Sequence, residues 1–185
     1  MNNQTIAVND DMAEAEDIQS CVRDGRPVRH NGPYKIAVGN ERLEYASVVI
    51  DDPVPSGRQI LLVSGCKPVE EYLIFKMLKN GDLEELRLEE TTDLRAAGIE
   101  RFLVFHSDRS FRFELDGTRF EWGVSLISGA ALKKLAGVDL NTYGVWQEFR
   151  KSGVEDKLIA NGELINLAEP GVEWFFTGLK QTTEG

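Results

Sequence analysis

Few residues of this sequence have the types and the spacing that catalysis requires. Two histidines occur, His30 and His106. His106 is followed by Ser107 and Asp108, the residue types of a nucleophilic triad, but three consecutive residues point apart and do not converge on one reacting atom. His30 has no cysteine or carboxylate at the spacing of a metal site. We therefore expect neither histidine to be catalytic or to bind a metal.

The remaining reactive side chains predict no active site either. Cys21 and Cys66 lack a metal-like spacing, and reduced thiols in a cytoplasmic protein are the default for such a pair. Acidic pairs such as Asp51–Asp52 lie next to each other in sequence, and neighbours on a strand face opposite sides of the sheet. No phosphate-binding loop is present. The sequence therefore predicts a protein that is not an enzyme and that uses no cofactor.

One chemical group of interest is the carboxylate at the end of the chain. Gly185 has no side chain that would crowd an attack on this carboxylate. The preceding residues include no proline and nothing bulky after Leu179, and they reach about 20 Å at ~3.3 Å per residue. A tail of this kind can thread into a narrow activating site, although a frayed terminus has the same composition. The tail consists of Leu179, Lys180, Gln181, Thr182, Thr183, Glu184 and Gly185.

The tail follows an internal repeat, which predicts the fold of most of the chain. Three blocks recur in the same order at offsets of 72 to 77 residues, which indicates a tandem duplication of a unit of about 70 residues. Five residues, Asp51 to Pro55, form an insertion in the first copy. The matched blocks are Ser56–Gly65 with Ser128–Gly137, Arg42–Tyr45 with Arg119–Trp122, and Gly98–Phe102 with Gly171–Phe175.

Each copy predicts a hairpin, a short helix and further strands. Gly39–Asn40 and Asp116–Gly117 are typical hairpin turns. Ser56 and Ser128 are expected to cap the helices, whose core-facing residues would be Ile60, Leu61 and Val63 in one copy and Leu132 and Leu135 in the other. This order predicts an α+β fold with two β-grasp domains. We expect a first domain over 33–106, a second over 110–178, and a C-terminal tail over 179–185.

Residues 1–32 lie outside the repeat and are set off by Asn31–Gly32–Pro33. We expect a flexible arm, and the alternative is an arm that docks on a folded surface. Ile6 and Val8 alternate as in an extended strand, so they are candidates for self-association by strand addition. Ala13 to Val22 could form one or two helical turns.

Charge and hydropathy exclude several classes of protein. The formal net charge is −10 and the isoelectric point is near 4.8, which argues against binding to nucleic acid. No apolar run approaches the ~18 residues of a membrane span. The first residues lack the pattern of a signal peptide. We expect a cytoplasmic protein that binds neither nucleic acid nor membrane.

Four motifs of the first copy resemble the bacterial multiubiquitin domain. The resemblance covers residues 34–178. The second copy departs from it at Ala130–Ala131, where the first has Arg58–Gln59. The motifs are Asp-Asp-Pro-Val-Pro-Ser-Gly-Arg-Gln at 51–59, Glu-Glu-Tyr at 70–72, Asp-Leu-Arg at 93–95 and Gly-Ile-Glu-Arg-Phe at 98–102.

The resemblance implies a ubiquitin-like modifier of bacterial antiphage operons. It would be activated at the Gly185 carboxylate and joined to targets through an isopeptide bond. Its partners would be an activating enzyme, a conjugating enzyme and a JAB-type isopeptidase. The ending Thr183-Glu184-Gly185 differs from the Gly-Gly after an arginine that is usual in ubiquitin-type tails.

Two other functions remain open from the residues alone. Tandem β-grasp units could assemble without covalent transfer, because their sheets have open edges and Ile6 and Val8 could donate a strand. A homo-oligomer would then form through the N-terminal arm. A passive adaptor that binds a basic partner through its acidic surface is the third alternative.

Overall fold

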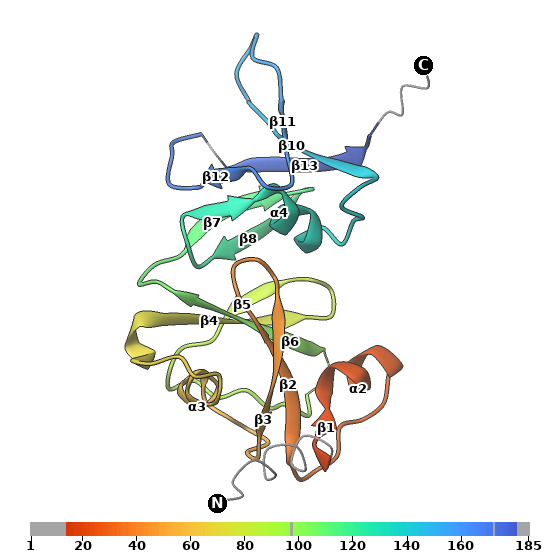
Figure 1. Cartoon of the computed structure of the whole chain (residues 1–185), viewed down its shortest axis with the longest axis vertical. Helices are drawn as coiled ribbons and strands as arrows, with labels where there is room; N and C mark the ends of the chain where they lie inside the picture. The colour runs from red at the N-terminus through yellow and green to blue at the C-terminus, as the bar shows by residue number, and fades with distance from the viewer. Residues whose placement is uncertain (1–13, 97, 172, 181–185) are drawn as a thin grey trace, which may run out of the picture. The chain divides into compact units, whose positions relative to one another are not determined.

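The computed structural model describes residues 14–96, 98–171 and 173–180. The chain divides into two compact units, which consist mainly of the residues up to His106 and of those from Ser107 onward. Figure 1 colours the first unit from red to green and the second from green to blue. Each unit combines a mixed sheet with a short helix after the first hairpin. The predicted α+β fold of two tandem ubiquitin-like β-grasp domains is confirmed.

The first unit consists of β1 (Glu16–Asp17), α2 (Ile18–Asp24), β2 (Tyr34–Gly39), β3 (Tyr45–Ile50), α3 (Gly57–Val63), the 3₁₀ turn η1 (Val69–Glu71), β4 (Tyr72–Leu78), β5 (Leu83–Glu85) and β6 (Ile99–His106). The strand order is β3–β2–β6–β4–β5, and β1 also pairs with β2. The last strand, β6, lies in the middle of the sheet, parallel to β2 and antiparallel to β4.

The second unit consists of β7 (Phe111–Leu115), β8 (Thr118–Trp122), β9 (Leu126–Ser128), α4 (Gly129–Leu135), β10 (Tyr143–Gln147), β11 (Lys157–Ile159), β12 (Leu164–Asn166) and β13 (Trp174–Leu179). Its main sheet has the order β8–β7–β13–β10–β11, which repeats that of the first unit. Strands β9 and β12 form a separate two-stranded sheet. The last strand, β13, is again central.

The repeated Ser-Gly pair begins both central helices for the same reasons. The hydroxyl groups of Ser56 and Ser128 accept hydrogen bonds from backbone N–H groups of the first turns of α3 and α4. The glycine that follows each serine lies against backbone: a Cβ on Gly57 would come 2.6 Å from the carbonyl oxygen of Arg87, and one on Gly129 would collide with the carbonyl oxygen of Ala160. The predicted helix starts are confirmed, and they also require glycine for close packing.

The helices bury part of the expected apolar face. Ile60 and Leu61 are fully buried in the core of the first unit, and Leu132 is fully buried in the second. Val63 was expected in the core but its exposed fraction is 42%. Leu135 is half-buried. Both helices have only seven residues, so their last apolar residue lies at the frayed final turn rather than over the sheet.

The N-terminal segment is folded from Glu16 onward, which corrects the expectation of a flexible arm over 1–32 for that part. β1 pairs in parallel with the start of β2. The Asp17 carboxylate caps α2 by accepting from the N–H of Ser20. Ile18 and Cys21 are buried because they share one face of α2, three residues apart. The first domain therefore includes residues before 33, and Ile6 and Val8 lie outside the described residues.

None of the helices in the described part of the chain has the length and apolarity that crossing a bilayer requires.

Candidate functional site

The end of β13 is where the structure places the first residues of the expected tail. Leu179 still belongs to the strand, pairs with Tyr143, and is 67% exposed. The N–H of Lys180 donates to the carbonyl oxygen of Thr142 at 2.9 Å. The expected boundary at 178 is therefore wrong by two residues, because the ladder between β10 and β13 continues to Lys180. The other tail residues, Gln181, Thr182, Thr183, Glu184 and Gly185, lie outside the described residues.

A hairpin turn of the same unit holds β13 near its end. Asp116 accepts one hydrogen bond from the N–H of Thr177 at 2.7 Å and another from its hydroxyl at 2.8 Å. Asp116 lies in the left-handed region with φ of 51°, as the predicted Asp-Gly turn requires. The sequence identified the turn, but it contained no sign that Asp116 would clamp the last strand 61 residues later.

An aromatic surface, defined as Trp146, Phe176 and Leu158, lies on the face of the sheet opposite the buried residues. The rings of Trp146 and Phe176 stack with centroids 5.5 Å apart and planes 8° from parallel. Leu158 pairs with Trp146 across β11 and β10 and is 52% exposed. The indole lies flat over Gly144, where a Cβ would collide with the ring, and borders Gly178. A partly exposed apolar surface next to the exit of β13 is suited to protein contacts.

Three aromatic residues, Trp174, Phe175 and Phe176, follow one another at the start of β13, and Trp174 does not belong to the core. It is half-buried, and the Arg150 guanidinium lies over its ring at 4.5 Å from the centroid. Arg150 also forms ion pairs with Glu114 and Glu148. Phe175 is the buried member of the run and packs edge-to-face on Phe113. Strand alternation explains this difference, since neighbours face opposite sides.

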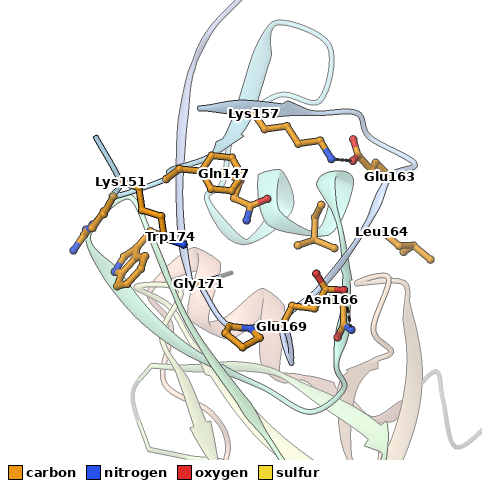
Figure 2. Close-up of a pocket in the computed structure, with 13 residues that line it drawn as sticks. Gln147, Lys151, Lys157, Glu163, Leu164, Asn166, Glu169, Gly171 and Trp174 are labelled. Carbon is orange, nitrogen blue, oxygen red and sulfur yellow. Dashed lines mark hydrogen bonds and ion pairs between the residues drawn. The ribbon is translucent and has the colours of Figure 1, made fainter. Parts of the chain in front are cut away.

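A pocket of about 570 Å³ opens at the other end of β13, where β10 finishes. Its floor includes Gln147, which is 5% exposed. Figure 2 shows the Gln147 amide pointing into the space between β10, β12 and the start of β13. The pocket could not be predicted from the sequence, because its walls combine several strands with the segments that connect them. The lining residues are Gln147, Phe149, Arg150, Lys151, Lys157, Glu163, Leu164, Ile165, Asn166, Glu169, Pro170, Gly171 and Trp174.

His106, Cys21 and Cys66 have different surroundings in the described part of the chain. His106 Nε2 lies 3.0 Å from Glu71 Oε2, and both side chains are exposed. Burial raises the pKa of the Cys21 and Cys66 thiols, which disfavours the reactive thiolate. Among the described residues, no three His, Cys, Asp or Glu side chains gather as a metal site would require.

The comparisons with known proteins agree with the repeat. A family model described as multiubiquitin matches residues 40–107 and, a second time, residues 111–180. The first match begins after β2 and so covers only part of the first unit, and the second runs from the start of β7 to Lys180. No curated protein matches the chain.

Proposed function

Because the chain belongs to the multiubiquitin family, we propose that it is a protein modifier whose Gly185 carboxylate is activated and joined to targets. The observation that carries this proposal is the path of β13. The strand is central in its sheet, and its end is exposed at Leu179 and Lys180. A chain leaving the sheet in this way can present a carboxylate to an enzyme without unfolding the unit.

The activation and transfer of the Gly185 carboxylate would take three steps, each catalysed by another protein. The Gly185 carboxylate attacks the α-phosphate of ATP, which releases pyrophosphate and forms an acyl adenylate. A thiol of the activating or conjugating enzyme then displaces AMP and forms a thioester. An amine or hydroxyl of the target displaces the thiol and leaves an amide or ester. A JAB-type isopeptidase would reverse the last bond, and bacterial antiphage defence is the setting in which we place this cycle.

In this proposal the aromatic surface is the contact for the activating and conjugating enzymes. It lies beside Gly178, one residue before the exposed Leu179, so an enzyme that holds the surface would also receive the tail. Aromatic side chains dominate the energetics of many protein interfaces. The surface is partly exposed, which leaves room for a partner to bury it.

The test is intact-mass analysis after incubation with the cognate activating enzyme, ATP and magnesium. Deleting Gly185 should abolish the ATP-dependent adduct. Leu158→Asp should slow its formation about tenfold or more, because a charge would be buried at the contact. Leu62→Asp is the matched control, since Leu62 is a similarly exposed leucine of the first unit. Full adduct formation by the deletion variant would refute the proposal.

A second candidate function is assembly without covalent transfer. Within the described strands, β3 and β8 each pair with only one neighbour, so each sheet has an open edge that can accept a strand. Light scattering on the full chain and on a variant without residues 1–13 separates this function from the first. An oligomer that becomes a monomer on truncation supports assembly, and a monomer at high micromolar concentration contradicts it.

A further inference from the structure

The two units differ at the end of the sheet where β4 and β10 finish. In the first unit, Leu78 at the end of β4 packs against a core that includes Ile18 of α2, and Val22 joins the same cluster. Lys79 Nζ donates to the carbonyl oxygen of Val22 at 3.5 Å. The segment of β1 and α2 therefore closes this end of the first unit.

The second unit has no preceding segment that could do the same. Only residues 107–110 separate β6 from β7. Phe149 occupies the position of Leu78, and it lines the pocket of about 570 Å³ instead of packing under a helix. The pocket therefore opens at the place that the first unit fills with its own chain.

The floor of this pocket carries the carboxamide of Gln147, which has no hydrogen-bond partner within the described part of the protein. Gln147 corresponds to Lys76, because each pairs with the buried phenylalanine of the last strand, Phe175 or Phe102. Lys76 forms an ion pair with Glu84 at 3.1 Å. In the described part of the chain, no group donates to or accepts from the Gln147 side chain. The amide is not fully cut off from solvent, so a ligand that hydrogen-bonds with it would take the place of water.

The pocket wall formed by β12 supplies a second unused feature. β12 pairs with β9 along one edge, and no described strand pairs with its other edge. Leu164 and Asn166 of β12 line the pocket. An unpaired edge offers backbone donors and acceptors to an added strand. Gln147 presents the same combination, since a carboxamide both donates and accepts.

The side walls indicate which residues an added strand would carry. Phe149, Leu164 and Pro170 form apolar walls around the floor. The Lys151 ammonium at the mouth has no carboxylate within ion-pair distance among the described residues, whereas Lys157 is paired with Glu163. An apolar side chain suits the walls, and an acidic neighbour suits Lys151.

We propose that this pocket binds an extended peptide segment of a partner protein, which adds to the free edge of β12. One apolar side chain of the peptide enters the pocket, its backbone hydrogen-bonds with the Gln147 amide, and an adjacent Asp or Glu pairs with Lys151. The site is independent of Gly185, so it would serve recognition and not the covalent step.

The experiment is a selection of random short peptides displayed on phage against the full chain, followed by affinity measurement with the synthetic consensus peptide. We expect a consensus of an apolar residue next to Asp or Glu. Gln147→Leu should weaken binding about tenfold or more, because the peptide backbone loses its amide partner. Lys151→Ala should weaken it about two- to fivefold. Lys67→Ala, an exposed cation of the first unit, should leave it unchanged.

A stability measurement separates loss of binding from loss of fold. Gln147→Leu replaces an amide that has no protein partner among the described residues by an apolar group of similar size, so its melting temperature should equal or exceed that of the wild type. Three results would overturn the proposal. They are no enrichment over a library panned on an unrelated protein, a consensus peptide whose affinity ignores both Gln147→Leu and Lys151→Ala, and selection of basic instead of acidic sequences.

Discussion

The first and second units share one strand order, but they differ at one buried position of the central helix. The first unit has an apolar side chain there and the second has a charged one. Leu61 of α3 is buried among apolar side chains, and its counterpart in α4, 72 residues later, is Lys133. Lys133 is 1% exposed, and its ammonium donates to the carbonyl oxygen of Leu140 and to Asn161 Oδ1. The fold tolerates either residue only because the second unit supplies both acceptors.

The two units also differ at the end of the sheet where β4 and β10 finish. The first unit joins β4 to β5 through the short turn 79–82 and covers the end of the sheet with α2. The second unit joins β10 to β11 through the longer segment 148–156 and forms a pocket there. The two copies share the central core but differ at this end of the sheet. In the first unit α2 covers it, and in the second unit it forms a pocket.

The largest effect is expected from placing the lysine of the second unit into the first. In Leu61→Lys the new ammonium would have no acceptor like Asn161, whose counterpart is Leu88. We expect the free energy of unfolding of the first unit to fall by about 3–5 kcal/mol. Hydrogen exchange resolved by residue would measure this loss, with the exposed Leu62→Lys as control. A loss under about 1 kcal/mol would show that the helix shifts to expose residue 61.

Removing the apolar anchor of α2 tests whether the N-terminal segment belongs to the first unit. Ile18 is 2% exposed, so Ile18→Ala should cost about 2–4 kcal/mol in the first unit. Exchange of the β2 and β6 amides should accelerate, while that of β7 and β13 stays unchanged. Val63→Ala, at an exposed position, should change stability by less than about 0.5 kcal/mol. Equal effects of both substitutions would contradict the packing of α2.

Replacing the buried lysine of the second unit should change how stability depends on pH. Burial, with a smaller contribution from the Lys180 ammonium, lowers the pKa of Lys133 below 10.5. Between its lowered pKa and 10.5 the unfolded chain binds more protons, so the free energy of unfolding rises with pH in that window. Lys133→Leu should remove this rise and increase stability at neutral pH by up to about 2 kcal/mol. Urea denaturation across this pH range measures both, and an unchanged rise would contradict the assignment.

The smallest effect concerns Asp93, whose counterpart in the second unit is Asn166. The Arg95 side chain and backbone N–H hydrogen-bond to Asp93 and lower its pKa from 3.8 to about 2. The carboxylate therefore contributes stability above pH 3.8 that is lost as the pH falls toward 2. The pair is partly exposed, so Asp93→Asn should cost less than about 1 kcal/mol. The free energies of unfolding of the wild type and of Asp93→Asn, measured as a function of pH, should converge near pH 2. A difference that stays constant down to pH 2 would contradict the role of Arg95 in lowering the pKa of Asp93.

Much of the fold was predictable from local patterns. The repeat, the turns at Asp116–Gly117 and the caps at Ser56 and Ser128 are all encoded within a few residues, and the structure confirms them. One or two helical turns within Ala13 to Val22 were also expected, but so short a helical segment does not show whether it will find a surface to pack on. The docking of α2 could not be predicted because it depends on the open end of a sheet built from distant strands.

The candidate sites, unlike the repeat and the turns, depend mostly on contacts between residues far apart in the sequence. The sequence alone determined the duplicated β-grasp units, with the hairpin turn and the capped helix of each, because side-chain periodicity and turn residues act locally. Only the tertiary structure decided that Trp146 stacks on Phe176, that Asp116 clamps Thr177, and that the Gln147 amide faces a pocket. These contacts join residues 30 to 61 positions apart or walls from separate loops. Strand register sets them, and register follows from the packing of the whole sheet.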